Sequence, residues 1–181
     1  MALTKVSNDL LNGSIAYDKI LGTDRPCFYA YNSAIASNGT GNNTTWVLDS
    51  NNDTTVGVTW TTAFDQNGDF DTTAVGSGST GGIFTAPVTG KYLFTATIKT
   101  GGFAVTTCDT IAFGIIASNR GVDMADEGTN MWEDEKGSSQ SVVVDMDAAD
   151  TCYLRLRMNG NGSDNVDIGN GLLVFTGCLL A

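Results

Sequence analysis

The sequence contains no histidine, only 2 prolines and few basic residues. Without histidine the chain cannot build a Ser-His-Asp or Cys-His nucleophilic centre, or a zinc or iron site with histidine ligands. Only 9 Lys and Arg stand against 20 Asp and Glu, which gives a net charge of −11. A chain this acidic repels nucleic acid and anionic membrane surfaces, so we expect neither as a partner. We also predict that the chain is not an enzyme.

Long hydrophobic runs are missing as well. No stretch reaches the roughly 18 apolar residues that a membrane span needs, so we expect no membrane insertion. The first twenty residues lack the continuous apolar core of a secretory signal. The four cysteines stand far apart without a C-x-x-C pair, and we expect four small buried thiols. No phosphate-binding loop or dinucleotide fingerprint occurs, so we predict no cofactor.

The residues that are abundant favour β-structure. The chain has 22 Gly and is rich in Thr, Asn, Ser and Asp, which are typical of strands and turns. Alternating, β-branched or aromatic stretches predict strands at 26–34, 54–64, 90–100, 109–118, 139–146, 152–158 and 171–180. Gly, Asn and Asp clusters separate these strands. The pattern predicts an all-β antiparallel sandwich or jelly roll over residues 25–181, preceded by a separate docking or stalk segment at 1–24.

The last predicted strand is apolar on both faces. Leu172, Val174, Cys178 and Leu180 fall on one side, and Leu173, Phe175 and Leu179 fall on the other. A strand of this kind is buried on both sides. Only one side can face the core of a sandwich, so the other must be covered by a second subunit or by a loop. We therefore expect an oligomer.

The stretch "FDQNGDFD" at 64–71 places oxygen-bearing side chains at alternate positions, as a calcium loop does. In an EF-hand loop, Asp65, Asn67 and Asp69 would take positions 1, 3 and 5. However, position 6 is Phe70 instead of glycine, and position 12 is glycine instead of glutamate. The Asn-Gly pair inside the stretch favours a hairpin turn that returns Phe70 to the core. Calcium bound by the three polar residues stays open as the alternative.

The same stretch begins a longer motif that resembles a known family. The motif has an acidic residue, an aromatic five positions later, then F-x5-G-x-Y-x-F, and it closes with "VFTGCLL" at 174–180. Its residues are Asp65, Phe70, Phe84, Gly90, Tyr92, Phe94, Phe175 and Gly177. This pattern resembles the globular head of complement C1q, within the tumour-necrosis-factor-like jelly rolls. Residues 25–33 resemble the first strand of that family, and residues 138–156 resemble one of its hairpins.

The resemblance implies a homotrimer packed around a threefold axis. The domain also resembles small heads on bacteriophage fibres, spikes and capsids, which implies a non-enzymatic virion protein. Residues 1–24 would attach the head to other virion proteins of the capsid or tail. Loops would contact a glycan or protein of the host surface. The candidate loops are 37–45, 49–55, 71–83, 119–138 and 159–170.

Two other functions remain open. The first is a free lectin-like binding module, which shares the fold but needs no docking segment. The second is a polysaccharide-degrading spike, for which Glu133, Asp134 and Glu135 are the carboxylates and Trp132 is the sugar-stacking residue. Adjacent side chains on an extended chain point to opposite faces, so we favour a solvated acidic loop here.

Overall fold

The computed structural model describes residues 25–48, 56–73, 81–102, 106–127 and 135–180. These residues form ten strands and no helix. The strands are β1 (Cys27–Asn32), β2 (Thr45–Val47), β3 (Trp60–Asp65), β4 (Phe84–Thr85), β5 (Gly90–Gly101), β6 (Thr110–Ala117), β7 (Arg120–Glu127), β8 (Glu135–Met146), β9 (Thr151–Asn159) and β10 (Asp167–Leu179).

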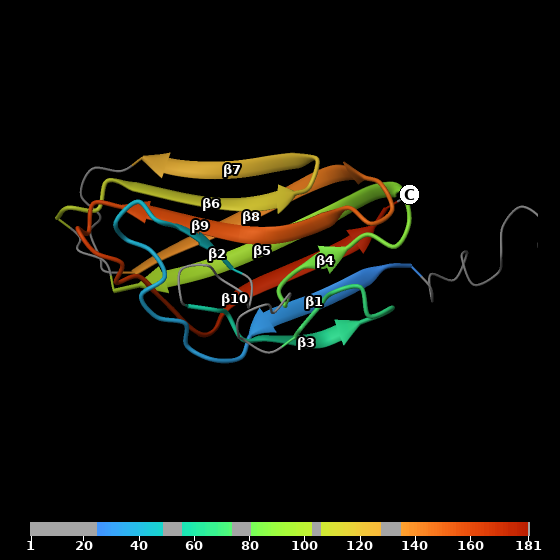
Figure 1. Cartoon of the computed structure of the whole chain (residues 1–181), viewed down its shortest axis with the longest axis horizontal. Coiled ribbons are helices and arrows are strands. Elements are labelled where there is room, and N and C mark those ends of the chain that lie inside the picture. Colours follow the sequence, from blue (N-terminus) through green and yellow to red (C-terminus); the bar gives the residue numbers. More distant parts are fainter. Residues whose placement is uncertain (1–24, 49–55, 74–80, 103–105, 128–134, 181) are drawn as a thin grey trace, which may run out of the picture.

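The strands form two antiparallel sheets that face each other (Figure 1). Sheet A has the order β3-β1-β10-β5-β8, and sheet B has the order β2-β9-β6-β7, with β4 paired to β9. The first and last strands are neighbours, so the chain enters and leaves the sandwich at the same end (Figure 1). The predicted all-β jelly roll is confirmed.

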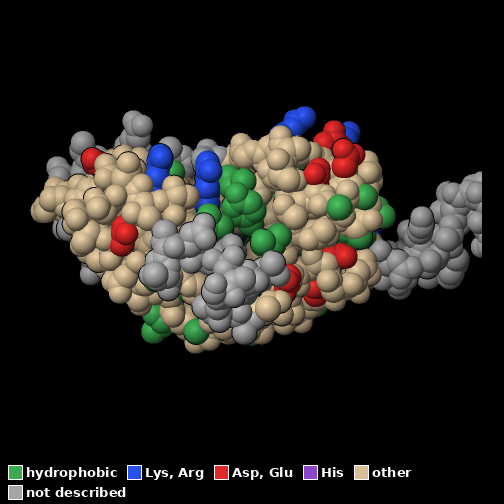
Figure 2. All heavy atoms as spheres, in the orientation of Figure 1, with side chains coloured by type: hydrophobic (Ala, Val, Ile, Leu, Met, Phe, Trp, Pro, Cys, Tyr) green, Lys and Arg blue, Asp and Glu red, His purple; other side chains and the backbone are tan. Residues whose placement is uncertain are grey.

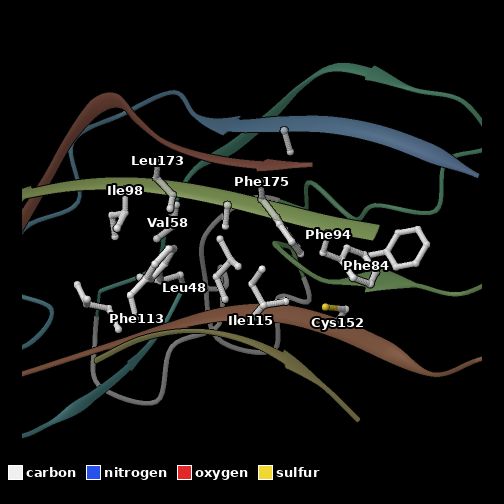
Figure 3. Packing of buried hydrophobic residues seen from close by; sticks show 14 of the residues in the cluster. Leu48, Val58, Phe84, Phe94, Ile98, Phe113, Ile115, Cys152, Leu173 and Phe175 are labelled. Carbon is white, nitrogen blue, oxygen red and sulfur yellow. The ribbon is translucent and has the colours of Figure 1, made fainter. Parts of the chain in front are cut away.

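The core lies between the sheets and follows the period-2 alternation of the strands. On β5, Tyr92, Phe94 and Ala96 are fully buried, while the residues between them face outward. On β9, Leu154 and Leu156 do the same from sheet B. Figure 3 shows side chains from both sheets pointing toward one another.

The expected two-sided strand is also present. On β10, Leu173 and Phe175 are fully buried, whereas Leu172 is 40% exposed on the opposite face. A bend interrupts this strand, because its pairing with β5 shifts between Ile168 and Leu173. The buried side chain of Asn32 bridges the bend: its Nδ2 donates to the Gly169 carbonyl at 2.7 Å, and its Oδ1 accepts the Leu173 N–H at 2.8 Å.

Several predicted boundaries were wrong. The strand expected at 54–64 begins only at Trp60. In the described residues just before it, the Val56 carbonyl accepts the indole N–H of Trp46 at 3.0 Å and the Thr59 carbonyl accepts the Ser33 N–H at 2.8 Å. The candidate loop 119–138 contains β7 and the start of β8. Strand β7 was not predicted because its sequence is polar. It lies at the edge of sheet B, where a strand does not need alternating apolar residues. The motif residue Gly90 begins β5 and lies opposite Met146.

The expectation of four buried thiols was also wrong. Cys108 and Cys152 are buried and free, and burial raises the pKa of both thiols. Cys27 and Cys178, however, are direct partners across β1 and β10 and form a disulfide. Their distance of 151 residues in the sequence concealed the pairing, because only the sheet order brings the first and last strands together.

We predict that this disulfide stabilises the head strongly. A cross-link that closes a loop of this length is worth about 5 kcal/mol in the chain-entropy model. Replacing both Cys27 and Cys178 by serine should therefore lower the melting temperature by many degrees. A reducing agent should lower the melting temperature of the parent protein and leave that of the double variant unchanged. Equal melting temperatures for the parent and the double variant would contradict this prediction.

Candidate functional site

The outer face of sheet A is the candidate functional surface. The register aligns its outward side chains in three rows that cross the sheet. The rows are Cys27–Cys178–Leu93–Val143, then Phe64–Tyr29–Thr176–Thr95–Ser141, then Thr61–Tyr31–Val174–Thr97–Ser139. We call this surface the uncharged face, because no residue in the three rows carries a charge.

Apolar and aromatic side chains on this face are open to solvent. Val143 is 55% exposed, Phe64 is 50% exposed and Leu93 is 37% exposed. Tyr29 lies 6.3 Å from Phe64 and 6.5 Å from Tyr31, measured between ring centroids. We call these three rings the aromatic ridge. Exposed apolar and aromatic groups that gather on one face are typical of a surface that another molecule covers.

Charged residues frame the uncharged face. Lys91 pairs with Asp145 in the register at one end. At the other end, Lys99 Nζ lies 2.5 Å from a carboxylate oxygen of Glu135. Acidic side chains also gather beside the β8–β9 turn, at the end of the sandwich near the C-terminus (Figure 2). A centre without charges and a charged rim are typical of a protein interface.

The outer face of sheet B differs in this respect. Arg155 and Arg157 of β9 project from it, because the alternate residues Leu154, Leu156 and Met158 fill the core. This surface therefore carries two guanidinium groups on one strand, whereas the three rows of sheet A carry no charge. For this reason we take sheet A as the candidate interface.

The uncharged face is hollowed beside the bend in β10. Gly137 of β8 and Gly171 of the bend contribute no side chains there, and Thr97, Leu172 and Val174 are among the surrounding residues. The hollow measures about 310 Å³.

The motif residues gather in the core directly beneath this face. Phe28 stacks on Phe70 at 4.6 Å and on Phe84 at 5.2 Å, and it meets Phe175 edge-on at 5.1 Å. Gly177 allows this packing, because a Cβ there would lie 2.5 Å from the Phe28 ring.

Two further motif residues close turns. The hydroxyl of Tyr92 donates to the Val88 carbonyl at 2.7 Å and fastens the turn before β5. Burial raises the pKa of Tyr92. The carboxylate of Asp65 accepts three backbone N–H groups, from Gly68 and Asp69 at 3.1 Å and from Phe70 at 3.0 Å. These bonds explain the spacing of five residues between the acid and the aromatic.

The turn at Asn67-Gly68 is present, with Gly68 in the left-handed region at φ 74°. The chain does not return along β3 as a hairpin, however. Phe70 instead forms an isolated bridge with Phe84, next to β9. The hairpin prediction was wrong in this respect. The Phe70 ring is buried against Phe28, Trp60 and Phe175, and its backbone bridges Phe84 of β4, so the chain crosses from sheet A to sheet B.

The three calcium candidates lie along this turn. The carboxylate of Asp65 is occupied by backbone N–H groups. Asp69 keeps one buried oxygen without a hydrogen-bond partner, and its burial raises the pKa of the carboxyl group. Across the described part of the chain, no group of three acidic or cysteine residues converges as a metal site would require. Calcium binding stays a prediction.

Two of the candidate loops meet at the end opposite the last strand's C-terminal end and the start of the described head, and we call it the distal end (Figure 1). Backbone bonds join loop 37–45 to loop 159–170, such as Gly39 N–H to the Val166 carbonyl at 3.1 Å. Asp164 and Asp167 accept backbone N–H groups of Asn42 and Asn38. These bonds make the two loops one stiff unit.

Other candidates lie outside the described residues, namely segment 1–24, loop 49–55, Trp132, Glu133 and Asp134. Of loop 71–83, only residues 71–73 and 81–83 are described. Glu135 belongs to β8, where it pairs with Lys99. No helix in the described ranges is long and apolar enough to cross a membrane.

Sequence reasoning missed most of the uncharged face, although signals were present. Strand β1 is aromatic on both sides, with Phe28 buried and Tyr29 and Tyr31 outward, like the two-sided last strand. On β5, the outward positions between Lys91 and Lys99 contain no charge. Each signal lies on a single strand, and only the sheet order joins them into one surface.

The described residues define a two-sheet jelly-roll head with one uncharged outer face. A family model, the C1q domain, matches residues 61–180, about two thirds of the chain. The chain belongs to the C1q domain family. Domains of this family form homotrimers and are generally non-enzymatic binding modules.

Solved structures share the fold. The globular domain of zebrafish complement 1qA is 14% identical, with a TM-score of 0.50, and the match covers 86% of this chain and 98% of that one. Murine APRIL at pH 8.5 is 10% identical, with a TM-score of 0.51, and the match covers 87% of this chain and 100% of that one. No curated protein matches the sequence.

We predict that the Asp65 carboxylate is essential to the turn. Replacing Asp65 by alanine leaves three N–H groups without an acceptor and should cost about 1–3 kcal/mol of unfolding free energy. Asparagine should lie between alanine and the parent, since it keeps one oxygen. Asp164→Ala is the control, because only one N–H bond to its side chain is described, at an exposed site. Urea denaturation measures all three variants, and equal stability of Asp65→Ala and the parent would contradict the prediction.

Proposed function

We propose that this chain is the non-enzymatic binding head of a homotrimer, in which neighbouring copies bury the uncharged face. The observation that carries the proposal is the continuous, charge-free surface across all five strands of sheet A. Family membership supports a threefold assembly. Burial of Phe64, Leu93 and Val143 between copies stabilises the trimer by the hydrophobic effect and leaves no charge of the three rows buried without a partner.

Binding uses the distal end. Its loops lie away from the termini, and the bonds between loops 37–45 and 159–170 hold them in one arrangement. Stiff loops lose little conformational entropy when they bind a ligand, so they suit recognition. Their surface is rich in Asn, Ser and Asp, which offer hydrogen bonds to a glycan or protein of a host cell surface.

The head is carried on a bacteriophage particle, attached to other virion proteins through residues 1–24. Two features support this proposal. The segment holds apolar residues at partly helical spacing, including Leu3, Val6 and Leu10, which suits docking onto a partner. The described head begins at the end opposite the distal loops, so attachment there would point the loops outward (Figure 1).

A single charge should break the trimer. Leu93→Lys places an ammonium group between Cys178 and Val143. The charged neighbour on the same strand face is Lys91, which cannot pair with it. Burying this ammonium group without a partner costs several kcal/mol. We expect light scattering to show mostly single chains at micromolar concentration. Val88→Lys is the matched control, because Val88 is 46% exposed in a turn outside the face and should leave the trimer intact. A Leu93→Lys protein that remains trimeric would contradict the proposal.

Deletion of residues 1–22 separates attachment from assembly. The shortened chain should keep the oligomeric mass of the full head, because the uncharged face is untouched. It should no longer sediment with virions assembled in its presence. A shortened chain that still sediments with virions would refute attachment through residues 1–24. The free lectin-like module would instead show glycan binding without any association of the full chain with particles.

A further inference from the structure

The uncharged face carries two complementary features, and their positions indicate how the copies fit together. The aromatic ridge lies on β1 and β3, at one edge of sheet A. The hollow beside Gly137 and Gly171 lies on β5, β8 and β10, toward the other edge. We propose that Phe64 of one copy, backed by Tyr29 and Tyr31, inserts into the hollow of the next copy. This inference rests on the proposed homotrimer.

Symmetry requires such a pair of unlike patches. In a twofold dimer, a patch contacts the same patch of its partner. In a closed ring of three, each copy contacts the next through two different surfaces. A face with a protruding ridge near one edge and a hollow near the other provides that asymmetry. A uniform face would not.

Shape and chemistry match. Phe64 is 50% exposed on the edge strand and therefore free to enter a neighbouring surface. The hollow of about 310 Å³ exceeds the roughly 150 Å³ that holds a benzene ring in a protein interior. Leu172 and Val174 offer apolar contacts to the ring, and Thr97 and Ser139 offer hydroxyl groups to the neighbouring tyrosines. Lys99 also lines the hollow, and its ammonium group is paired with the carboxylate of Glu135.

The sheet order makes the contact testable by cross-linking. Strands β3 and β8 stand at opposite edges of sheet A, four strand spacings apart, which is about 19 Å. A disulfide between Phe64→Cys and Ser139→Cys in one chain is therefore out of reach. The same pair can join only if Phe64 of one copy meets Ser139 of another. The native cysteines do not compete, because two are paired and two are buried.

The first experiment oxidises the double variant Phe64→Cys/Ser139→Cys in the full chain. We expect a covalent trimer on a non-reducing gel, and neither single variant should form one. Light scattering under reducing conditions measures assembly separately. A protein that is trimeric in solution but does not cross-link overturns this inference and leaves the proposed homotrimer standing. A protein that is monomeric overturns both. Covalent dimers of the Phe64→Cys single variant also overturn the inference, because they indicate that the aromatic ridges of two copies contact each other.

The second experiment fills the hollow. A Cβ at Gly137 would meet only the Ile98 carbonyl, at the ordinary contact distance of 3.8 Å, so the head itself can accept a side chain there. Gly137→Leu should weaken trimer formation about tenfold or more, because the added side chain occupies the place of Phe64. Gly137→Ala is the matched control and should assemble almost as the parent does. Equal assembly of the leucine and alanine variants overturns the inference.

Discussion

The contact between the Phe28 ring and Gly177 is the constraint on which the rest of the structure depends. These residues are direct partners across β1 and β10, and no side chain fits where Gly177 stands. The space lets Phe28 reach Phe70, Phe84 and Phe175, which come from three other segments of the chain. One aromatic cluster thereby joins the first strand, the last strand and the crossing between the sheets.

The uncharged face is a direct consequence of that cluster. Because side chains alternate along a strand, each residue that enters the core places its neighbours on the outer surface. Burying Phe28 turns Cys27 and Tyr29 outward, and burying Phe175 turns Val174 and Thr176 outward. The disulfide beside the cluster fixes the same two strands covalently. The core and the uncharged face are thus the two sides of one sheet, and neither can shift its register alone.

Sequence alone predicted the parts of the fold that strong local patterns specify. The alternation of β5 and β9 and the buried side of the last strand were correctly predicted, because each depends on one strand. Strand β7 was missed because an edge strand with polar residues lacks an apolar period. The disulfide and the rows of the uncharged face were missed because they depend on which strands are neighbours. The crossing at Phe70 was missed because the Asn-Gly turn does not determine the partner of the strand that follows it.

The central claim is that copies of this chain cover the uncharged face of sheet A. Native mass spectrometry of the unaltered protein, with hydrogen exchange on the same sample, tests it most directly. We expect a particle of three times the 18.9 kDa chain mass, with the backbone amides of edge strand β8 protected from exchange. A single chain of 18.9 kDa at the same concentration, with freely exchanging amides along that edge, would contradict the claim.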